Sequence, residues 1–199
     1  MIAITAHATP VQPQLLFLAL NVAWCASETW LGLRRRAADG GARDAGTLGL
    51  LWRLLMLGIA AAVAVTISGY GHLPAAWQAP MRWTGCALIG GGLALRFWSI
   101  HVLARFFTVD VSVQQGHELV RHGPYRWVRH PSYTGALLCF LGLGVGLANV
   151  FALPLLCLPV YWAFRRRIQV EETALRAAFP DAYAAYAAQT GRLLPTRLV

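Results

Sequence analysis

Five apolar runs constrain the fold of this chain more than any other feature, and they lie at about residues 13–33, 47–70, 81–107, 132–147 and 150–164. A membrane-spanning helix needs roughly 20 mostly apolar residues, so the first three runs are long enough and the last two are short. The chain is also 57% hydrophobic and only 13% charged, whereas soluble domains average about 25% charged residues. We therefore expect an all-α integral membrane protein with about five transmembrane helices, built as a single domain over residues 1–199.

The distribution of positive charge predicts an orientation in the membrane. The chain has 17 Lys and Arg residues against 8 Asp and Glu residues, and the arginines gather at the ends of the apolar runs. Five spans place segments 34–43, 105–129 and 165–176 on one side, and the 71–80 loop and a tight hairpin turn at residues 148–149 on the other. Arginine-rich loops stay in the cytoplasm, so we expect an outside N-terminus, a cytoplasmic C-terminus and an inner-membrane location. This placement explains the charge better than nucleic-acid binding does.

The start of the chain lacks a basic region before its first apolar run. A cleaved signal peptide normally has one. We therefore expect the first span to be retained.

A polar stretch at residues 121–135, RHGPYRWVRHPSYTG, interrupts the apolar runs. Its two prolines prevent one regular helix, and irregular backbone beside membrane spans is tolerated where it lines a site. We expect three N-terminal spans over residues 1–105 and a site-forming part over residues 106–199. That part would contain an extended piece at 108–113, a turn at 114–116, a helical hairpin closed by the arginines at 165–167, and an amphipathic cytoplasmic tail helix that Pro180 breaks.

Three ionisable residues fall inside predicted spans, namely Glu28, Arg96 and His101. Ionisable side chains are costly in a membrane and often mark function. Arg96 lies halfway along its span and most needs a partner, for which Glu28 is a candidate. Such a pair fits a functional role or a purely structural one.

The carboxylates Glu171 and Glu172 follow three arginines at the end of the last run. They fit an exposed helix start, with Arg167 and Glu171 paired four residues apart, or a binding site for a cationic or hydroxyl-rich ligand. His130 is held extended by Pro131 and fits either an interfacial residue or a ligand contact.

Metal binding is not indicated. The spacing of His117, His122 and His130 does not match known zinc motifs. The four cysteines each lie within an apolar run, which is typical of small buried residues rather than of metal ligands or disulfides.

Short motifs in the second half resemble a known family in their order and spacing. They are His117-Glu-Leu-Val120, Gly123-Pro-Tyr125, Arg129-His-Pro-Ser-Tyr133 with Gly135, and Arg167 with Glu171-Glu172, followed by Leu175, Phe179 and Tyr183. Through them, residues 106–186 resemble the membrane isoprenylcysteine carboxyl methyltransferases and their bacterial relatives, which are related to the phospholipid methyltransferases. Ser27-Glu28 and Asp44-Ala-Gly-Thr47 are similar to a pattern in the bacterial members.

The resemblance implies S-adenosylmethionine as methyl donor, a site at the cytoplasmic face, and a lipid-like acceptor bearing a carboxylate, amine or thiol. The implied cofactor contacts are Gln114, His117, Glu118, Leu119, Val120, Tyr125, His130, Pro131, Ser132, Tyr133, Glu171 and Glu172. Arg167 and Arg129 are the implied catalytic residues, which orient the acceptor. Two other interpretations are an NADPH-dependent membrane reductase of the sterol-reductase type, which has a similar RHP block, and a non-catalytic membrane binding protein.

Overall fold

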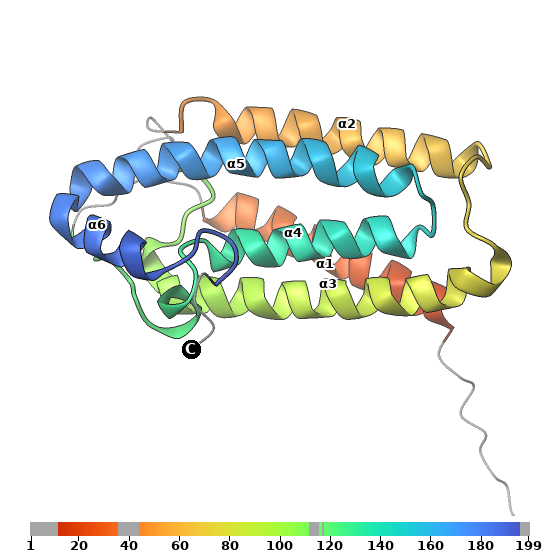
Figure 1. Ribbon diagram of the computed structural model, residues 1–199, viewed down its shortest axis with the longest axis horizontal. Coiled ribbons are helices and arrows are strands. Elements are labelled where there is room, and N and C mark those ends of the chain that lie inside the picture. The colour runs from red at the N-terminus through yellow and green to blue at the C-terminus, as the bar shows by residue number, and fades with distance from the viewer. Residues whose placement is uncertain (1–11, 36–43, 112–115, 117, 196–199) are drawn as a thin grey trace, which may run out of the picture.

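The computed structural model describes residues 12–35, 44–111, 116 and 118–195, and these form an all-helical bundle (Figure 1). The helices are α1 (Pro13–Arg34), α2 (Thr47–Ile67), α3 (Ala75–Leu103), α4 (Pro131–Gly146), α5 (Ala152–Ala178) and α6 (Pro180–Gln189), with 3-10 turns η1 (Ala104–Phe106) and η2 (Gly123–Arg126). In the described residues the only β-type pairings are two isolated bridges. Helices α1 and α2 and the stretch Ala75–Phe106 are long and apolar enough to cross a membrane, and α4 is a shorter apolar helix.

Proline starts three of these helices. Pro13, Pro131 and Pro180 each occupy the first helical position, where the missing N–H has no intrahelical partner to lose. The last five residues of the polar stretch, 131–135, therefore form the start of α4.

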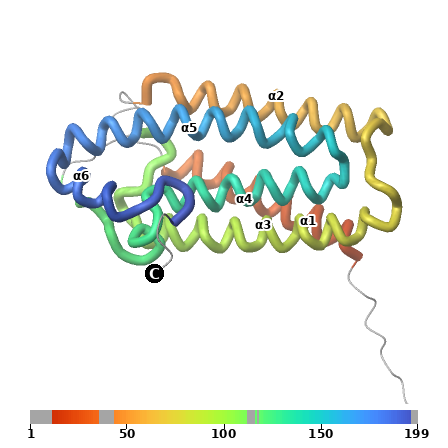
Figure 2. Tube along the Cα trace, in the orientation of Figure 1, coloured from red at the N-terminus to blue at the C-terminus, as the bar shows by residue number. Residues whose placement is uncertain are grey.

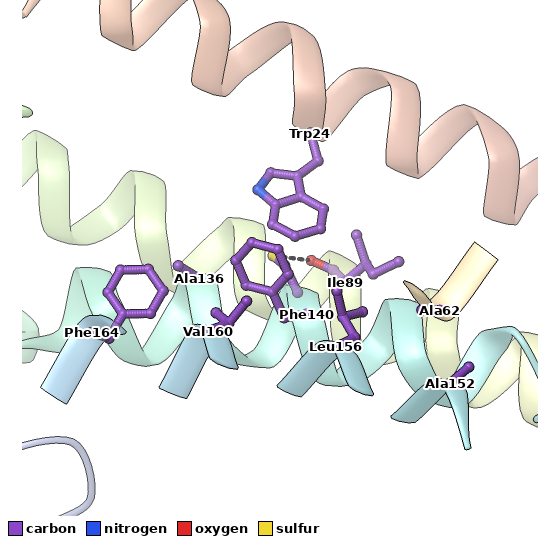
Figure 3. Close-up of a cluster of buried hydrophobic side chains, with 10 residues drawn as sticks. Trp24, Ala62, Ile89, Ala136, Phe140, Ala152, Leu156, Val160 and Phe164 are labelled. Carbon is purple, nitrogen blue, oxygen red and sulfur yellow. Dashed lines mark hydrogen bonds between the residues drawn. The ribbon is translucent and has the colours of Figure 1, made fainter. Parts of the chain in front are cut away.

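The helices pack in pairs around a common core. Helix α2 lies along α5, α3 along α4, and α1 contacts α3, while α4 and α5 join the two pairs (Figure 1). Trp24 of α1 meets Phe140 of α4 edge-on with ring centroids 4.6 Å apart, and Leu156, Val160 and Phe164 of α5 lie beside them (Figure 3). Aromatic and aliphatic side chains from all the long helices thus fill one core.

Glycines bring α3 and α4 into backbone contact. A methyl group built on Gly92 would lie 2.6 Å from the carbonyl oxygen of Gly135, and one built on Gly135 would lie 2.6 Å from that of Gly92. Gly85 and Gly142 repeat this contact two turns along the pair. Small residues allow such close approach between helices. The other two glycines of the 90–92 run have nothing within 4 Å.

Two connections meet at the end of the bundle opposite α6 (Figure 2). The Leu73 amide donates to the Ala148 carbonyl at 2.9 Å, and the Val150 amide donates to the Gly71 carbonyl at 3.0 Å. The Asn149 side chain also donates to a carbonyl of the α2–α3 loop. The tight turn between α4 and α5 and its position on the same side as the 71–80 loop are therefore confirmed.

Two predicted boundaries are wrong. Helix α3 begins at Ala75 rather than near residue 81, with Pro80 inside it as the sixth residue. Proline at this position removes one i→i−4 hydrogen bond, that to the carbonyl of Ala76. Helix α5 continues through the arginines to Ala178, so residues 165–167 do not end it, and the tail has no separate helix starting at 168. The first two of these arginines are exposed whereas Arg167 is buried, so one helix accommodates all three.

The predicted extended piece forms no strand over residues 108–111, and its last two residues lie outside the described part. Gly116 lies in a turn with φ of +70°, and the other two residues of the predicted 114–116 turn lie outside the described part.

Candidate active site

The inward face of α5 changes from apolar to polar along the helix. Leu156, Val160 and Phe164 are buried at intervals of four residues, and the same face continues with Arg167 and Glu171. Residues three and four apart share a helix face. The face of α5 that packs in the core therefore also places the Arg167 guanidinium and the Glu171 carboxylate at the end of the bundle where the polar stretch lies.

A cavity of about 610 Å³ occupies this end and extends between the helices. Its polar walls come from the connecting segment between α3 and α4 (residues 104–130) and from α4, α5 and α6, and its apolar walls come largely from α1 and α2. Leu33 on α1, together with Trp52 and Met56 on α2, lines the cavity while being exposed on the outer surface. The cavity thus opens sideways between α1 and α2, toward the lipid of a surrounding membrane.

The Tyr133 hydroxyl links the two charged residues of α5. It accepts a hydrogen bond from Arg167 Nε at 3.0 Å and donates one to Glu171 Oε2 at 2.7 Å. The Tyr133 ring stacks on His130 and packs against Phe164. The Tyr133 hydroxyl therefore bridges Arg167 and Glu171, and Arg167 forms its direct ion pair with a different carboxylate.

That ion pair is with Asp44, which lies in the loop before α2. Asp44 Oδ1 accepts from Arg167 Nη1 at 2.8 Å and from Thr47 Oγ1 at 3.0 Å, and Oδ2 accepts from the Leu48 amide at 2.8 Å. Arg167 also donates to the carbonyl of Val109. Burial alone would raise the pKa of Asp44, but the Leu48 amide and Arg167 outweigh it and the pKa lies below its ordinary value. Asp44 thereby ties α2, the connecting segment and α5 together.

Glu172 belongs to a separate cluster of charges. Its side chain is 1% exposed and accepts from Arg129 Nε at 3.1 Å and from Arg192 Nη2 at 2.9 Å, with His130 Nε2 at 3.4 Å. Burial would raise the pKa of this carboxyl, but the hydrogen bonds from His130, Arg192 and Arg129 hold it well below its usual range. Glu172 is therefore ionised, and it links the connecting segment and α5 to the C-terminal segment (residues 190–195) that follows α6.

The C-terminal segment forms backbone hydrogen bonds with the polar stretch. The Arg129 amide donates to the Gly191 carbonyl at 2.8 Å, the His130 amide donates to the Arg192 carbonyl at 3.0 Å, and the Gly191 amide donates to the Trp127 carbonyl at 3.3 Å. These bonds fix the backbone at His130, which directly precedes α4.

The predicted partnership of Glu28 with Arg96 is confirmed. Arg96 Nε and Nη2 lie 2.5 and 2.6 Å from the two carboxylate oxygens of Glu28. Arg96 Nη1 also donates to Ser132 Oγ at 2.9 Å, and Glu28, Arg96 and Ser132 all line the cavity. His101 is exposed near the end of α3.

Most of the residues predicted for the site come together at the cavity. Its lining includes Leu119, Val120, Tyr125, Arg129, His130, Ser132, Tyr133, Arg167 and Glu171. Glu118 is exposed, Pro131 is buried at the first position of α4, and Glu172 lies in the charge cluster, so these three stand outside the lining. Gln114 and His117 lie outside the described residues.

Three residues of the site were not predicted to belong to it: Tyr183 and Asp44 were named only within the motifs of the family resemblance, and Arg192 was not named at all. The Tyr183 hydroxyl is fully buried beside the cavity and has no hydrogen-bond partner among the described residues; only its place in the motif series could have indicated it. Asp44 precedes Thr47 by three residues, which is typical of a helix cap. Arg192 carries no sequence signal that separates it from a surface arginine.

Comparison with known proteins places this geometry in a family. Residues 80–182 match the phospholipid methyltransferase family. The protein-S-isoprenylcysteine O-methyltransferase of Tribolium castaneum is 38% identical over 87 residues, which cover 44% of this chain and 31% of that protein. A probable protein-S-isoprenylcysteine O-methyltransferase of Oryza sativa subsp. indica is 31% identical over 117 residues, which cover 58% of this chain and 61% of that protein. The chain therefore spans less than two thirds of either relative.

The fold is also that of a solved structure, the eukaryotic intramembrane Ras methyltransferase called isoprenylcysteine carboxyl methyltransferase. The two superpose with a TM-score of 0.68 and 21% sequence identity, over 96% of this chain and 69% of the other. Since the family match runs from α3 into α6 and covers more than half of the sequence, the chain belongs to the phospholipid methyltransferase family.

Proposed function

We propose that this protein transfers a methyl group from S-adenosylmethionine to a lipid-like acceptor at the cytoplasmic face of the inner membrane. The observation that carries the proposal is the shape of the cavity, which joins a polar, carboxylate-bearing end to apolar walls open between α1 and α2. A water-soluble methyl donor and an acceptor dissolved in the lipid bilayer can react only in a site that is open both to the aqueous phase and to the bilayer. Membership of the phospholipid methyltransferase family supports the reaction type.

The residues at the polar end fit the methyl donor. The Glu171 carboxylate lines the cavity and is suited to an ammonium group or ribose hydroxyls. The buried Tyr183 hydroxyl, which no described residue satisfies, needs a partner that a bound ligand would supply. Burial raises the pKa of Tyr183 above its ordinary value, so the hydroxyl stays protonated as a donor. When bound, S-adenosylmethionine supplies an electrophilic methyl group, and Gln114 and His117 stay among the proposed contacts.

The residues around Tyr133 would position the acceptor. Arg167 is held by Asp44 and by Tyr133, so the acceptor head meets a fixed guanidinium edge rather than a mobile side chain. Methyl transfer depends chiefly on alignment of the reacting groups and exclusion of water. Arg129 is bound to Glu172, and we assign it as a positioning residue that holds His130 and the start of α4.

The proposal includes five membrane crossings. Helices α4 and α5 run along the same long axis of the bundle as α3 (Figure 1), and we propose that α4 and the first part of α5 cross the membrane with it, although α4 has only 16 residues. The N-terminus would face outward and the C-terminal segment the cytoplasm. Cysteine-accessibility labelling should place the α2–α3 loop outside and α6 inside, and the reverse labelling would separate the site from the cytoplasmic donor pool.

Titration calorimetry on detergent-purified protein tests the donor. S-adenosylhomocysteine should bind, and Tyr183→Phe, which removes one buried hydroxyl, should weaken binding about tenfold or more with the melting temperature unchanged. Tyr70→Phe is the control, because Tyr70 is exposed in the α2–α3 loop, beside the turn between α4 and α5. Tight binding of NADPH without S-adenosylhomocysteine would instead identify a reductase. Full retention of binding in Glu171→Ala would favour a non-catalytic protein.

A further inference from the structure

We infer that Glu28 is a specificity-determining residue that accepts a hydrogen bond from an N–H or O–H group of the acceptor, close to its reacting end. This inference rests on the proposed methyl transfer and narrows its acceptor class. The acceptor would be a lipid-like molecule with a polar donor group beside its head, rather than a head attached directly to a bare hydrocarbon chain.

The first observation is that an ion pair lies within the wall of a largely apolar cavity. Arg96 grips both oxygens of Glu28 at 2.5 and 2.6 Å, and Trp24 Nε1 lies 3.3 Å from Oε1. Charged side chains inside membrane helices are costly, and an apolar pair of similar size often stabilises a buried site as well as or better than an ion pair. The pair therefore points to a polar requirement of the ligand.

The second observation is the hydrogen-bonding capacity that the pair leaves open. A carboxylate has about four acceptor positions, and the described residues fill two on Oε1 and one on Oε2 of Glu28. The side chain of Glu28 is 26% exposed, whereas that of Arg96 is 10% exposed and also bonds to Ser132. The Glu28 carboxylate, rather than the Arg96 guanidinium, can therefore accept a further hydrogen bond from a ligand in the cavity.

The third observation is the position of the pair. Arg96 connects Glu28 to Ser132, whose neighbour Tyr133 carries the hydroxyl between Arg167 and Glu171. Glu28 thus stands where the polar end of the cavity gives way to its apolar walls. An acceptor whose reacting group is at Tyr133 and whose chain runs between α1 and α2 passes this carboxylate.

A matched pair of acceptors tests the inference. The probes are N-acetyl-S-farnesylcysteine, which has an amide N–H, and the same molecule methylated on that nitrogen; a second such pair carries a primary amine in place of the carboxylate. With radiolabelled S-adenosylmethionine, the wild type should prefer the N–H form of a methylated pair by at least about tenfold in kcat/KM. Glu28→Gln should bring this ratio to within about threefold of unity through KM. Asp181→Asn makes the same chemical change on the exposed start of α6 and should keep the wild-type ratio.

A charge exchange separates specificity from a merely structural role. The double variant Glu28→Arg with Arg96→Glu restores an ion pair between α1 and α3, and we expect it to recover thermal stability relative to Glu28→Gln but not the preference for the N–H probe. Recovery of the preference together with stability, or an unchanged ratio in Glu28→Gln, would overturn the inference alone. Absence of methylation of every probe by the wild type would overturn the proposed function itself.

Discussion

The glycine run at residues 90–92 of α3 allows two neighbouring substitutions to be compared with opposite expectations. Gly92→Ala would place a methyl group 2.6 Å from the backbone oxygen of Gly135, whereas Gly91→Ala meets nothing within 4 Å. An ordinary contact between carbon and oxygen is about 3.3 Å or longer. Helices α3 and α4 must therefore separate by about 0.7 Å at this point to admit the methyl group of Gly92→Ala.

The difference between the two variants isolates the packing cost. Both substitutions gain the same alanine helix propensity, about 1 kcal/mol, so this contribution cancels in the comparison. Overpacking a close contact costs about 1–3 kcal/mol, and the blocking atom is backbone, which cannot swing aside. Gly92→Ala should thus be less stable than Gly91→Ala by about 1–3 kcal/mol.

Unfolding of the purified protein in mixed detergent micelles, followed by tryptophan fluorescence, measures this difference. Gly91→Ala should equal or exceed the wild type in stability. Gly92→Ala should also lose methyl transfer, because α4 carries Ser132 and Tyr133 into the cavity. Equal stability of the two alanine variants would refute the backbone contact between α3 and α4.

Other residues yield predictions of different kinds. Asp44→Ala leaves the buried Arg167 without its ion-pair partner, so we expect a loss of about 3–5 kcal/mol in unfolding free energy and of methyl transfer in the radiolabel assay. Ala104 has a φ of +51°, so Ala104→Gly should raise the unfolding free energy by about 1–2 kcal/mol; an unchanged value would argue against strain. The depressed pKa of Glu172 contributes stability that is complete above the ordinary carboxyl pKa of about 4.3 and is lost as pH falls below it. Melting temperatures between pH 7 and pH 3 should therefore fall more steeply for the wild type than for Glu172→Gln.

The apolar runs predicted the five long helices, though not the start of α3 or the end of α5, because the length and hydropathy of a span are local properties. They also predicted which connections share a side, since helices of similar length alternate in direction. The partnership of Glu28 with Arg96 was predictable for a related reason: a charge within an apolar run needs a partner, and few candidates exist.

Partners within polar sequence could not be predicted in this way. Asp44 has a sufficient local explanation, because it accepts hydrogen bonds from Thr47 and Leu48 in the first turn of α2, and nothing near it in the sequence indicates Arg167, which is 123 residues away. Arg192 likewise resembles any exposed arginine, and its tie to Glu172 depends on how the C-terminal segment folds back. Composition and periodicity report local structure, whereas these pairs are set by the tertiary path of the chain.

The wrongly predicted end of α5 prevented the sequence from distinguishing the roles of the adjacent carboxylates Glu171 and Glu172. Successive residues on a helix are rotated by about 100°, so the two side chains point in different directions, although each reaches one nitrogen of the His130 ring, Glu171 at 3.8 Å and Glu172 at 3.4 Å. The arginines at 165–167 predicted the end of the last apolar helix. A separate helix after them could have any rotation relative to the core, so either carboxylate could then contact the cofactor. Because α5 is continuous, the buried stripe of Leu156, Val160 and Phe164 extends in phase to Glu171 and leaves Glu172 on the neighbouring face. Helix continuity therefore assigns one carboxylate to the cavity and the other to the charge cluster that holds the C-terminal segment.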